Sequence, residues 1–217
     1  MASSVSLSYG AGLPFKYVGG DPSIDLVNTV DWTDRGLVED RLTDYERLTR
    51  WAEGAGIVAP RLTSQLRALA LEQPRVAERV HREAVELRWR LRQLFTAVER
   101  GERLDRTSEL QPFNESLRAT LSRLELAAPP RSVDHGAPAR WSWKEVSTRL
   151  DSLLWPVIRS AADLLISNEA ARIRECGGAD CGWMYVDRSR NGLRRWCQME
   201  TCGNREKQRR RASANSR

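Results

Sequence analysis

Histidine is scarce in this sequence of 217 residues, which contains only His81 and His135. Neither histidine lies near a cysteine or within a pattern typical of a catalytic site, so we interpret one as a helix-surface residue and the other as a loop residue. No segment reaches the roughly 18 uninterrupted apolar residues of a membrane span. The first residues also lack the charged leader and apolar stretch of a secretion signal. We therefore expect a cytoplasmic protein that does not enter a membrane.

Cysteine is also scarce, but its four copies fall within 27 residues: Cys176, Cys181, Cys197 and Cys202. Because cytoplasmic thiols stay reduced, such a cluster favours a metal site over a pair of disulfides. Two pairs, each with four residues between its cysteines, are typical of a tetrahedral zinc site in which two short loops each supply two sulfur atoms. Sulfur then fills every coordination position, so we predict one structural zinc ion and no enzymatic activity. Disulfide or redox chemistry is the alternative.

Negative charge is sparse around these cysteines. The whole chain has a net charge of +6, whereas the segment from Arg172 to Arg217 contains 12 Lys or Arg and 5 Asp or Glu residues. That segment alone has a balance of +7, which leaves −1 for the first 171 residues. Such an asymmetry indicates a polyanionic partner, although a solubilising basic tail gives the same pattern.

Most of the chain before the cysteines has the periodicity of helices. The predicted helices span residues 44–54, 63–73, 76–98, about 112–121, and 150–165. Thr43 and Glu46 have the spacing of a capping box, and Pro156 is expected to kink or split the last helix. Residues 23–30 fit a strand or a short helix, and residues 140–143 fit a strand.

The cysteine-bearing segment has the composition of a hairpin and a helix. Gly182–Asp187 and Leu193–Cys197 resemble strands, and Asn191-Gly192 between them is typical of a hairpin turn. Residues 204–212 contain no glycine or proline and are expected to form a basic helix. A segment of about 45 residues buries too little apolar surface to fold alone, so zinc, worth on the order of 10–16 kcal/mol in small metal-folded domains, is expected to hold it together.

These elements predict an α+β protein with three parts. A flexible arm is expected over residues 1–14, rich in serine and glycine, and a mainly helical α+β domain over residues 15–168. A small treble-clef or ribbon-like zinc finger, built from a β-hairpin and a basic helix, is expected over residues 169–217. The boundary is placed near Ser167 to Ala171.

Three short motifs in the finger resemble the CGNR-type zinc finger family: Asp187–Asn191, Arg194–Cys197 and Cys202–Arg205. Three upstream motifs resemble the ABATE domain, which precedes this finger in bacterial regulators assigned to the stress response: Asp25–Thr29, Trp51-Ala52 and Arg90–Phe95. The resemblance implies zinc bound by the four cysteines and a DNA-binding role in transcription regulation. Gln198 departs from the serine that often follows the third cysteine, and this difference leaves the ligands unchanged.

The finger is expected to contact DNA through two sets of cations, because Lys and Arg suit phosphate contacts. The hairpin supplies Arg188, Arg190, Arg194 and Arg195, and the helix supplies Arg205, Lys207, Arg209, Arg210 and Arg211. Some of these arginines are expected to offset the charge of the thiolates. An alternative function is a protein-interaction adaptor, whose basic finger docks on the transcription machinery or on another acidic protein.

The helical domain is expected to sense a signal or to mediate assembly. Its candidate ligand-pocket residues are Asp25, Asn28, Thr29 and Arg41. The competing interpretation of these polar residues is capping and turn formation. A bound ligand would shift either the exposure of the finger or a balance between monomer and homodimer.

Overall fold

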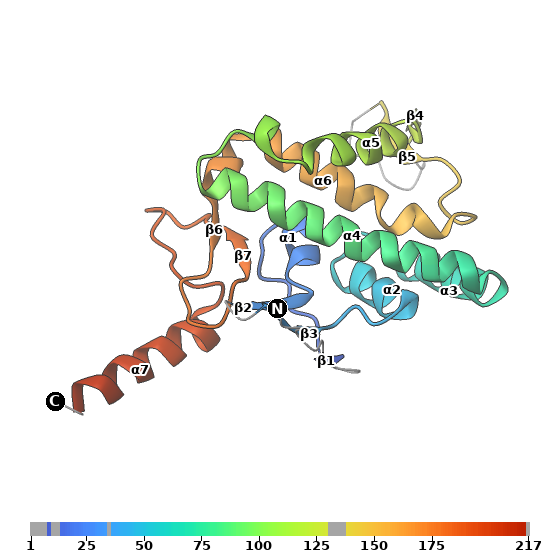
Figure 1. The fold of residues 1–217 in the computed structure, drawn as a ribbon. Helices are drawn as coiled ribbons and strands as arrows, with labels where there is room; N and C mark the ends of the chain where they lie inside the picture. The colour runs from blue at the N-terminus through green and yellow to red at the C-terminus, as the bar shows by residue number, and fades with distance from the viewer. Residues whose placement is uncertain (1–7, 10–13, 34–35, 130–137, 216–217) are drawn as a thin grey trace.

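The computed structural model describes residues 8–9, 14–33, 36–129 and 138–215. Within these residues, the protein consists of a helical body and a C-terminal finger of short strands, irregular loops and one projecting helix (Figure 1). This architecture confirms the predicted α+β class with a mainly helical N-terminal part. His135 and most of the expected N-terminal arm lie outside the described residues.

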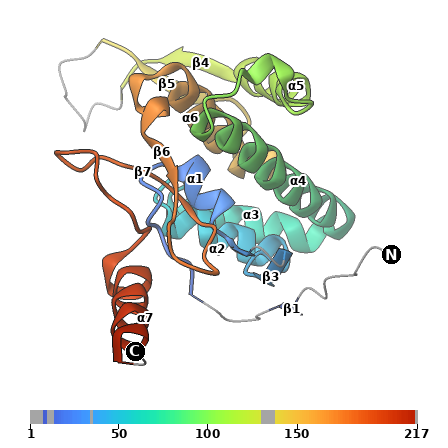
Figure 2. The same cartoon turned by 60° about the vertical axis from the view of Figure 1, so that its left-hand side comes forward.

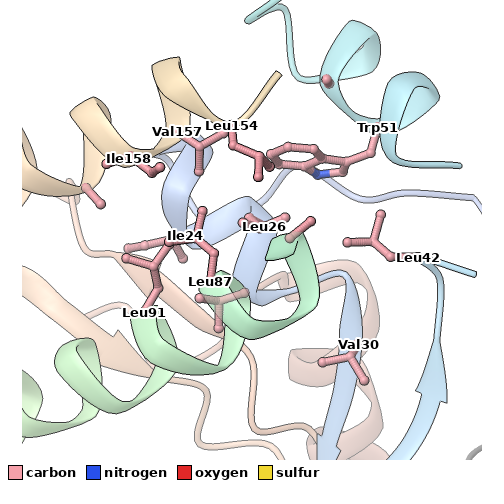
Figure 3. Packing of buried hydrophobic residues seen from close by; sticks show 14 of the residues in the cluster. Ile24, Leu26, Val30, Leu42, Trp51, Leu87, Leu91, Leu154, Val157 and Ile158 are labelled. Atoms are coloured by element: carbon pink, nitrogen blue, oxygen red, sulfur yellow. The ribbon is translucent and has the colours of Figure 1, made fainter. Parts of the chain in front are cut away.

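The body is built around its longest helix, α4 (Pro74–Glu99). Apolar residues recur every three or four positions from Val80 to Leu94 and are buried along one face of this helix. The short helix α1 (Pro22–Val27) lies between α4 and α6 (Trp155–Ile166) and is almost entirely buried. Figure 3 shows side chains of these three helices pointing toward one another in the core.

The remaining helices and 3₁₀ turns surround this core: α2 (Tyr45–Gly54), α3 (Pro60–Glu72), α5 (Leu110–Leu121), η1 (Leu104–Arg106), η2 (Leu150–Leu153) and η3 (Asn168–Arg172). The five predicted helices are all present, but several begin differently. The carboxylate of Asp44 caps α2 by accepting the N–H of Arg47 (2.8 Å), in place of the expected Thr43. Helix α3 begins at Pro60, because proline suits the first turn of a helix. Pro156 lies in the first turn of α6, after the break that separates it from η2.

Two small sheets flank the helices of the body. In the first, β1 (Ser8–Tyr9) pairs in parallel with β3 (Gly36–Asp40), which pairs antiparallel with β2 (Val30–Thr33). In the second, the predicted strand Arg140–Trp143 is present as β5 and pairs antiparallel with β4 (Leu124–Ala127). Residues 23–30, which fitted either a strand or a short helix in the sequence, are found in helix α1, the turn after it and the first residue of β2.

The finger contains a hairpin, although its second strand was predicted wrongly. Strand β7 (Met184–Val186) lies within the first predicted strand, but it pairs antiparallel with β6 (Ile173–Glu175). Residues 193–197 are irregular instead of forming the partner strand. The first pair of cysteines therefore lies inside the loop of the hairpin.

A side chain replaces the strand pairing that was expected after β7. A turn that contains Asn191 and Gly192 is present, but it begins at Ser189 and joins no pair of strands: the N–H of Gly192 donates to the carbonyl oxygen of Ser189 (3.2 Å). The carboxylate of Asp187 accepts the backbone N–H groups of Ser189 (2.9 Å) and Arg194 (3.0 Å). Asp187 thus holds both ends of this loop, and no strand ladder is needed to close it.

The finger shares the hydrophobic core of the body. Ile173, Trp183 and Met184 are buried in the same cluster as Ile24 and Leu91. Helix α7 (Asn204–Asn215) differs, because its described side chains are mostly exposed and it projects from the rest of the protein in both views (Figures 1 and 2). Among the residues described, no helix combines the length and the apolar character needed to cross a membrane.

Candidate metal centre

The four cysteines converge on one point of the finger. Cys176 and Cys181 lie between β6 and β7, whereas Cys197 precedes the π-helical turn η4 (Met199–Gly203) and Cys202 lies within it. All four sulfur atoms lie within 4.8 Å of one another, and the Sγ atom of Cys197 is 3.6 Å from those of Cys181 and Cys202. Four sulfur ligands at about 2.3 Å from zinc form a tetrahedron with edges of about 3.8 Å. The donor set and its spacing therefore fit one zinc ion, as predicted.

Backbone contacts hold the two cysteine loops against each other. The N–H of Gly177 in the first loop donates to the carbonyl oxygen of Arg195 in the second (2.9 Å), and the N–H of Cys197 donates to the sulfur of Cys176 (3.2 Å). Gly178 lies so close to the second pair that a Cβ atom there would be 3.1 Å from the Cβ atom of Cys202. Any larger residue at this position would push the loops apart, so glycine permits the close approach of the sulfurs.

Thiols at this spacing do not ionise independently. Hydrogen bonds from Cys181 and Cys197 hold the pKa of the Cys176 thiol well below its usual range, while the interaction with Cys176 raises the pKa of Cys197. Ionisation of Cys176 is thus favoured, and ionisation of Cys197 is disfavoured, first by its hydrogen bonds to the other thiols and further by burial and by like charge at short range. A divalent cation removes this repulsion and leaves a four-thiolate centre with a formal charge of −2.

Arginines lie beside the metal centre on two sides. The guanidinium of Arg194 donates to the carbonyl oxygens of Trp196 (3.0 Å) and Cys197. On another side, Arg41 and Arg205 line a cavity of about 240 Å³ whose wall includes three of the four cysteines. This placement supports the expectation that part of the arginine content of the finger serves the metal and not a partner.

Asn28, directly after α1, joins the finger to the helical body. Its Nδ2 atom donates to the carbonyl oxygen of Met184 (2.8 Å), and its Oδ1 atom accepts the N–H of the same residue (2.9 Å). The indole N–H of the neighbouring Trp183 donates to the carbonyl oxygen of Val30 (3.1 Å). We call the paired bonds between Asn28 and Met184 the Asn28 clamp. Both bonds are buried, so water does not compete for them.

An ion pair and a close backbone contact flank the Asn28 clamp. Arg92 of α4 donates to Glu175 of β6 (2.7 Å) and to the carbonyl oxygen of Gly182 (2.6 Å). Gly182 has a φ of +61°, and a Cβ atom there would lie 2.7 Å from the Cβ atom of Trp32. Both the left-handed conformation and the lack of space require glycine here. No sequence pattern pointed to Arg92 or Glu175 as docking residues, although Arg92 lies within the Arg90–Phe95 motif, and Gly182 was expected only at the start of a strand.

The four residues expected to line a ligand pocket are buried at or near this boundary: Asp25, Asn28, Thr29 and Arg41. The hydroxyl of Thr29 donates to the carbonyl oxygen of Leu26 (2.6 Å) and accepts from Arg88 (3.2 Å). The terminal nitrogens of Arg41 bind Asp31 (2.9 and 3.1 Å). These contacts give the residues structural roles, and a ligand pocket among them stays a prediction.

Asp25 connects indirectly to the finger through Gly19. Its carboxylate accepts the N–H of Gly19 (2.8 Å), and the carbonyl oxygen of Gly19 accepts the N–H of Val186 in β7 (2.8 Å). Burial raises the pKa of Asp25 from 3.8 to about 6. The fold therefore favours the protonated acid, because the charged form loses its hydration.

Replacement of Asp25 by asparagine is expected to flatten the pH dependence of stability. The stabilisation from a raised pKa is complete below about pH 4 and is lost as the pH rises through about 6. Between about pH 5 and about pH 7.5, we expect the wild type to lose about 1 kcal/mol more unfolding free energy than Asp25→Asn, measured by urea unfolding. The exposed Asp163 provides a control, since Asp163→Asn should follow the wild type. Parallel profiles for Asp25→Asn and the wild type would contradict the raised pKa.

The cations expected to contact nucleic acid differ in their surroundings. Those of α7 are exposed: Arg205, Lys207, Arg209, Arg210 and Arg211. Glu206 pairs with Arg209 (3.9 Å) and Arg210 (3.3 Å). Arg190 and Arg195 are exposed in the loop after β7. In contrast, Arg188 binds Glu169 through two nitrogens (2.6 and 2.7 Å), and Arg194 is held by the carbonyl oxygens described above. Arg188 and Arg194 therefore stabilise the finger itself.

Comparison with known protein families finds two adjoining matches. Residues 20–168 match ABATE, described as “Putative stress-induced transcription regulator”. Residues 172–213 match zf-CGNR, described as “CGNR zinc finger”. No curated protein matches the chain. The two matches agree in identity and order with the resemblances of the sequence motifs, and the second contains all four clustered cysteines.

Proposed function

The chain belongs to the ABATE family and ends in a CGNR zinc finger, and from this premise we propose that it is a zinc-dependent DNA-binding regulator of transcription. In this proposal the finger contacts DNA, and the helical body senses a signal or mediates assembly. The proposal depends mainly on one observation: α7 carries five exposed cations, and its N-terminal end is held by the metal centre.

The shape and composition of α7 suit a groove of DNA. The helix begins directly after Cys202 and Gly203, so the zinc ligands determine its direction. Its 12 residues span about 18 Å, and the major groove of B-DNA, about 12 Å wide, admits an α-helix. The helix contains no large apolar side chain that would pack it against the body. Arginine outnumbers lysine on it, and the planar guanidinium grips phosphate or guanine with two hydrogen bonds.

Alanine substitutions at Lys207, Arg209 and Arg211 are expected to weaken binding to a DNA duplex by about 30-fold or more. Each lost phosphate contact should also reduce the slope of log affinity against log salt by about 0.9. The measurement is fluorescence anisotropy of a labelled duplex of roughly 20 base pairs, titrated with zinc-loaded protein at about 50 mM and about 200 mM salt.

A matched control removes equal charge from the far end of α4, which lies away from α7 (Figure 1). Its substitutions are Arg75→Ala, Arg79→Ala and Arg82→Ala. The control should bind within about twofold of the wild type, apart from a small effect of net charge. Equal losses in both triple variants would argue against specific use of α7, and absent or salt-insensitive binding by the wild type would argue against the nucleic-acid function itself.

A second candidate function is a protein-interaction adaptor, and an exposed surface of the finger favours it. Leu193 and Met199 are exposed beside the half-buried Trp196, and together with Arg194 and Arg195 they line a cavity of about 450 Å³. Apolar residues next to arginines are typical of protein interfaces. Strong binding to an acidic protein without binding to duplex DNA would favour this function. The expected homodimer and cytoplasmic location stay predictions under either function.

Neither family is enzymatic in its description, and the metal centre suits a structural role. When four thiolates hold the zinc ion, no coordination position is left for water or a substrate. We therefore propose no catalytic role for this centre.

A further inference from the structure

A groove of about 1010 Å³ separates α7 from the helical body. Arg92 of α4 and Arg100, the residue that caps the C-terminus of α4, line one wall, and Arg209 and Arg210 of α7 line the other. The loop that carries the first cysteine pair forms the floor. The groove therefore joins the proposed DNA-binding helix to a surface of the helical body for which no role has been assigned.

Arg100 is the most distinctive cation in this groove. It is exposed at the end of α4 and forms no ion pair with any residue that the structure describes. Its positive charge adds to the effect of burial in lowering the pKa of Arg92, so the two guanidinium groups repel each other across the wall. An unpaired arginine beside a second arginine favours an anionic occupant.

An exposed tryptophan extends the same wall along α4. Trp89, Arg92 and Arg100 are separated by three and eight residues, which places them on one face of the helix. Trp89 is 49% exposed, and its ring lies 5.6 Å from that of Trp32, which lines the groove. Arginines combined with indole rings suit a sugar-phosphate chain, because the cations bind phosphate and the rings cover the less polar sugars or bases.

The carboxylates that line the walls of the groove are outnumbered by its arginines, so the walls keep a net positive charge. Glu175 is paired with Arg92, and Glu206 is paired with the two arginines of α7. Asp180 lies on the floor together with the metal ligands Cys176 and Cys181, and the negative charge of this floor repels phosphate toward the walls that carry arginine. The Asn28 clamp and the pair between Arg92 and Glu175 fix the finger on the body, so the position of the base of α7 relative to α4 is set before any ligand binds.

We propose that this groove holds one sugar-phosphate strand of the DNA duplex that α7 contacts, and that Arg100 binds a phosphate of that strand. The inference rests on the proposed function and deepens it, because the helical body then contributes directly to DNA binding. The helical body and the finger would then form one DNA-binding surface, in which the metal centre lies between Arg100 and the cations of α7.

Charge reversal at Arg100 tests this inference in the full-length, zinc-loaded protein. Arg100→Glu is expected to weaken binding of a labelled, random-sequence duplex of roughly 20 base pairs about tenfold, and Arg100→Ala is expected to reduce the salt slope by about 0.9. Arg82→Glu is the matched control, because it changes an exposed arginine of the same helix about 27 Å away. This control is expected to change the affinity less than about twofold.

Chemical modification provides a second measurement that does not depend on variants. Bound duplex is expected to protect Arg100 from phenylglyoxal, whereas Arg82 should react equally with and without DNA. Equal affinities of Arg100→Glu and Arg82→Glu, or an unprotected Arg100, would overturn the inference. If the alanine variant of α7 still loses binding in that case, the proposed function stands. A wild-type protein that binds no duplex would overturn both.

Discussion

Replacing Cys197 with serine is expected to release α7 from the body and to reduce duplex affinity at least about 100-fold, while β6 and β7 stay folded. The reason lies in what holds each part of the finger. Ile173 and Met184 are buried in the common core, and the Asn28 clamp secures β7 without a metal. Helix α7 has no comparable anchor, since it packs on η4, whose position depends on Cys202 and the metal. A structural zinc ion in small domains contributes on the order of 10–16 kcal/mol, enough to order such a segment.

Hydrogen exchange by mass spectrometry, combined with zinc quantification, measures this outcome. In Cys197→Ser, amides after residue 197 should lose protection, whereas those of residues 173–175 and 184–186 should keep most of theirs. Thr201→Ser is a suitable control, because it alters the same turn and removes no sulfur. Stoichiometric zinc and a protected α7 in Cys197→Ser would contradict the four-cysteine centre. Loss of protection throughout the finger would show instead that its hairpin depends on the metal as well.

The metal centre was predictable from the sequence because its chemistry is local in residue type and spacing. Four clustered cysteines in the reducing compartment that we expect have few uses other than metal binding, and the spacing of the pairs fixes the geometry closely. The long helix α4 was predictable for a similar reason, since its apolar period persists over many turns. The predicted ends of helices were less accurate, because neighbouring residues were equally suitable as the first residue or cap in place of Asp44 and Pro60.

The partner strand of the finger hairpin was not predictable in the same way. Residues 193–197 have the composition of a strand, and the Asn191-Gly192 turn directs the chain back toward β7. However, the carboxylate of Asp187 binds the N–H of Arg194, and β6 already occupies the pairing edge of β7. Strand propensity depends on which neighbour is available, and a short sequence does not contain that information.

The contacts that hold the finger against the helical body were also not predictable from the sequence. From the sequence, Asn28 and Thr29 were candidates for a ligand pocket, with capping and turn formation as the competing interpretation. Their partners lie in other segments: Met184 for Asn28, and Arg88 for Thr29. The motif Asp25–Thr29 is therefore explained, in part, by contacts across more than 50 residues of sequence. Only the three-dimensional structure reveals such contacts.

Replacing Arg88 with methionine is expected to lower the free energy of unfolding by about 3–5 kcal/mol. Its guanidinium pairs with Asp40 through both terminal nitrogens, at 2.7 and 2.5 Å, and the two side chains are only 3% and 5% exposed. The substitution leaves a carboxylate buried without its counter-ion, and an uncompensated buried charge costs several kcal/mol. Thr29 loses a hydrogen-bond donor as well. Urea unfolding of the zinc-loaded protein measures the loss, and Arg82→Met on the exposed face of α4 should change stability by less than about 0.5 kcal/mol.

A second substitution distinguishes the cost of the lone charge from the loss of packing. In Arg88→Met combined with Asp40→Asn, neither of the two positions carries a charge, and the new amide oxygen is still able to accept the N–H of Leu42, which Asp40 accepts at 2.9 Å. We expect this double variant to recover at least half of the lost stability, because removing both partners of a buried pair is far less costly than removing one. A double variant no more stable than Arg88→Met would show that the arginine acts through its packing and not through its charge. Arg88 and Asp40 join α4 to the end of β3, so recovery would also show that this junction tolerates neutral residues. It would mean that each charge requires the opposite charge beside it, while the ion pair as a whole adds little to the free energy of unfolding.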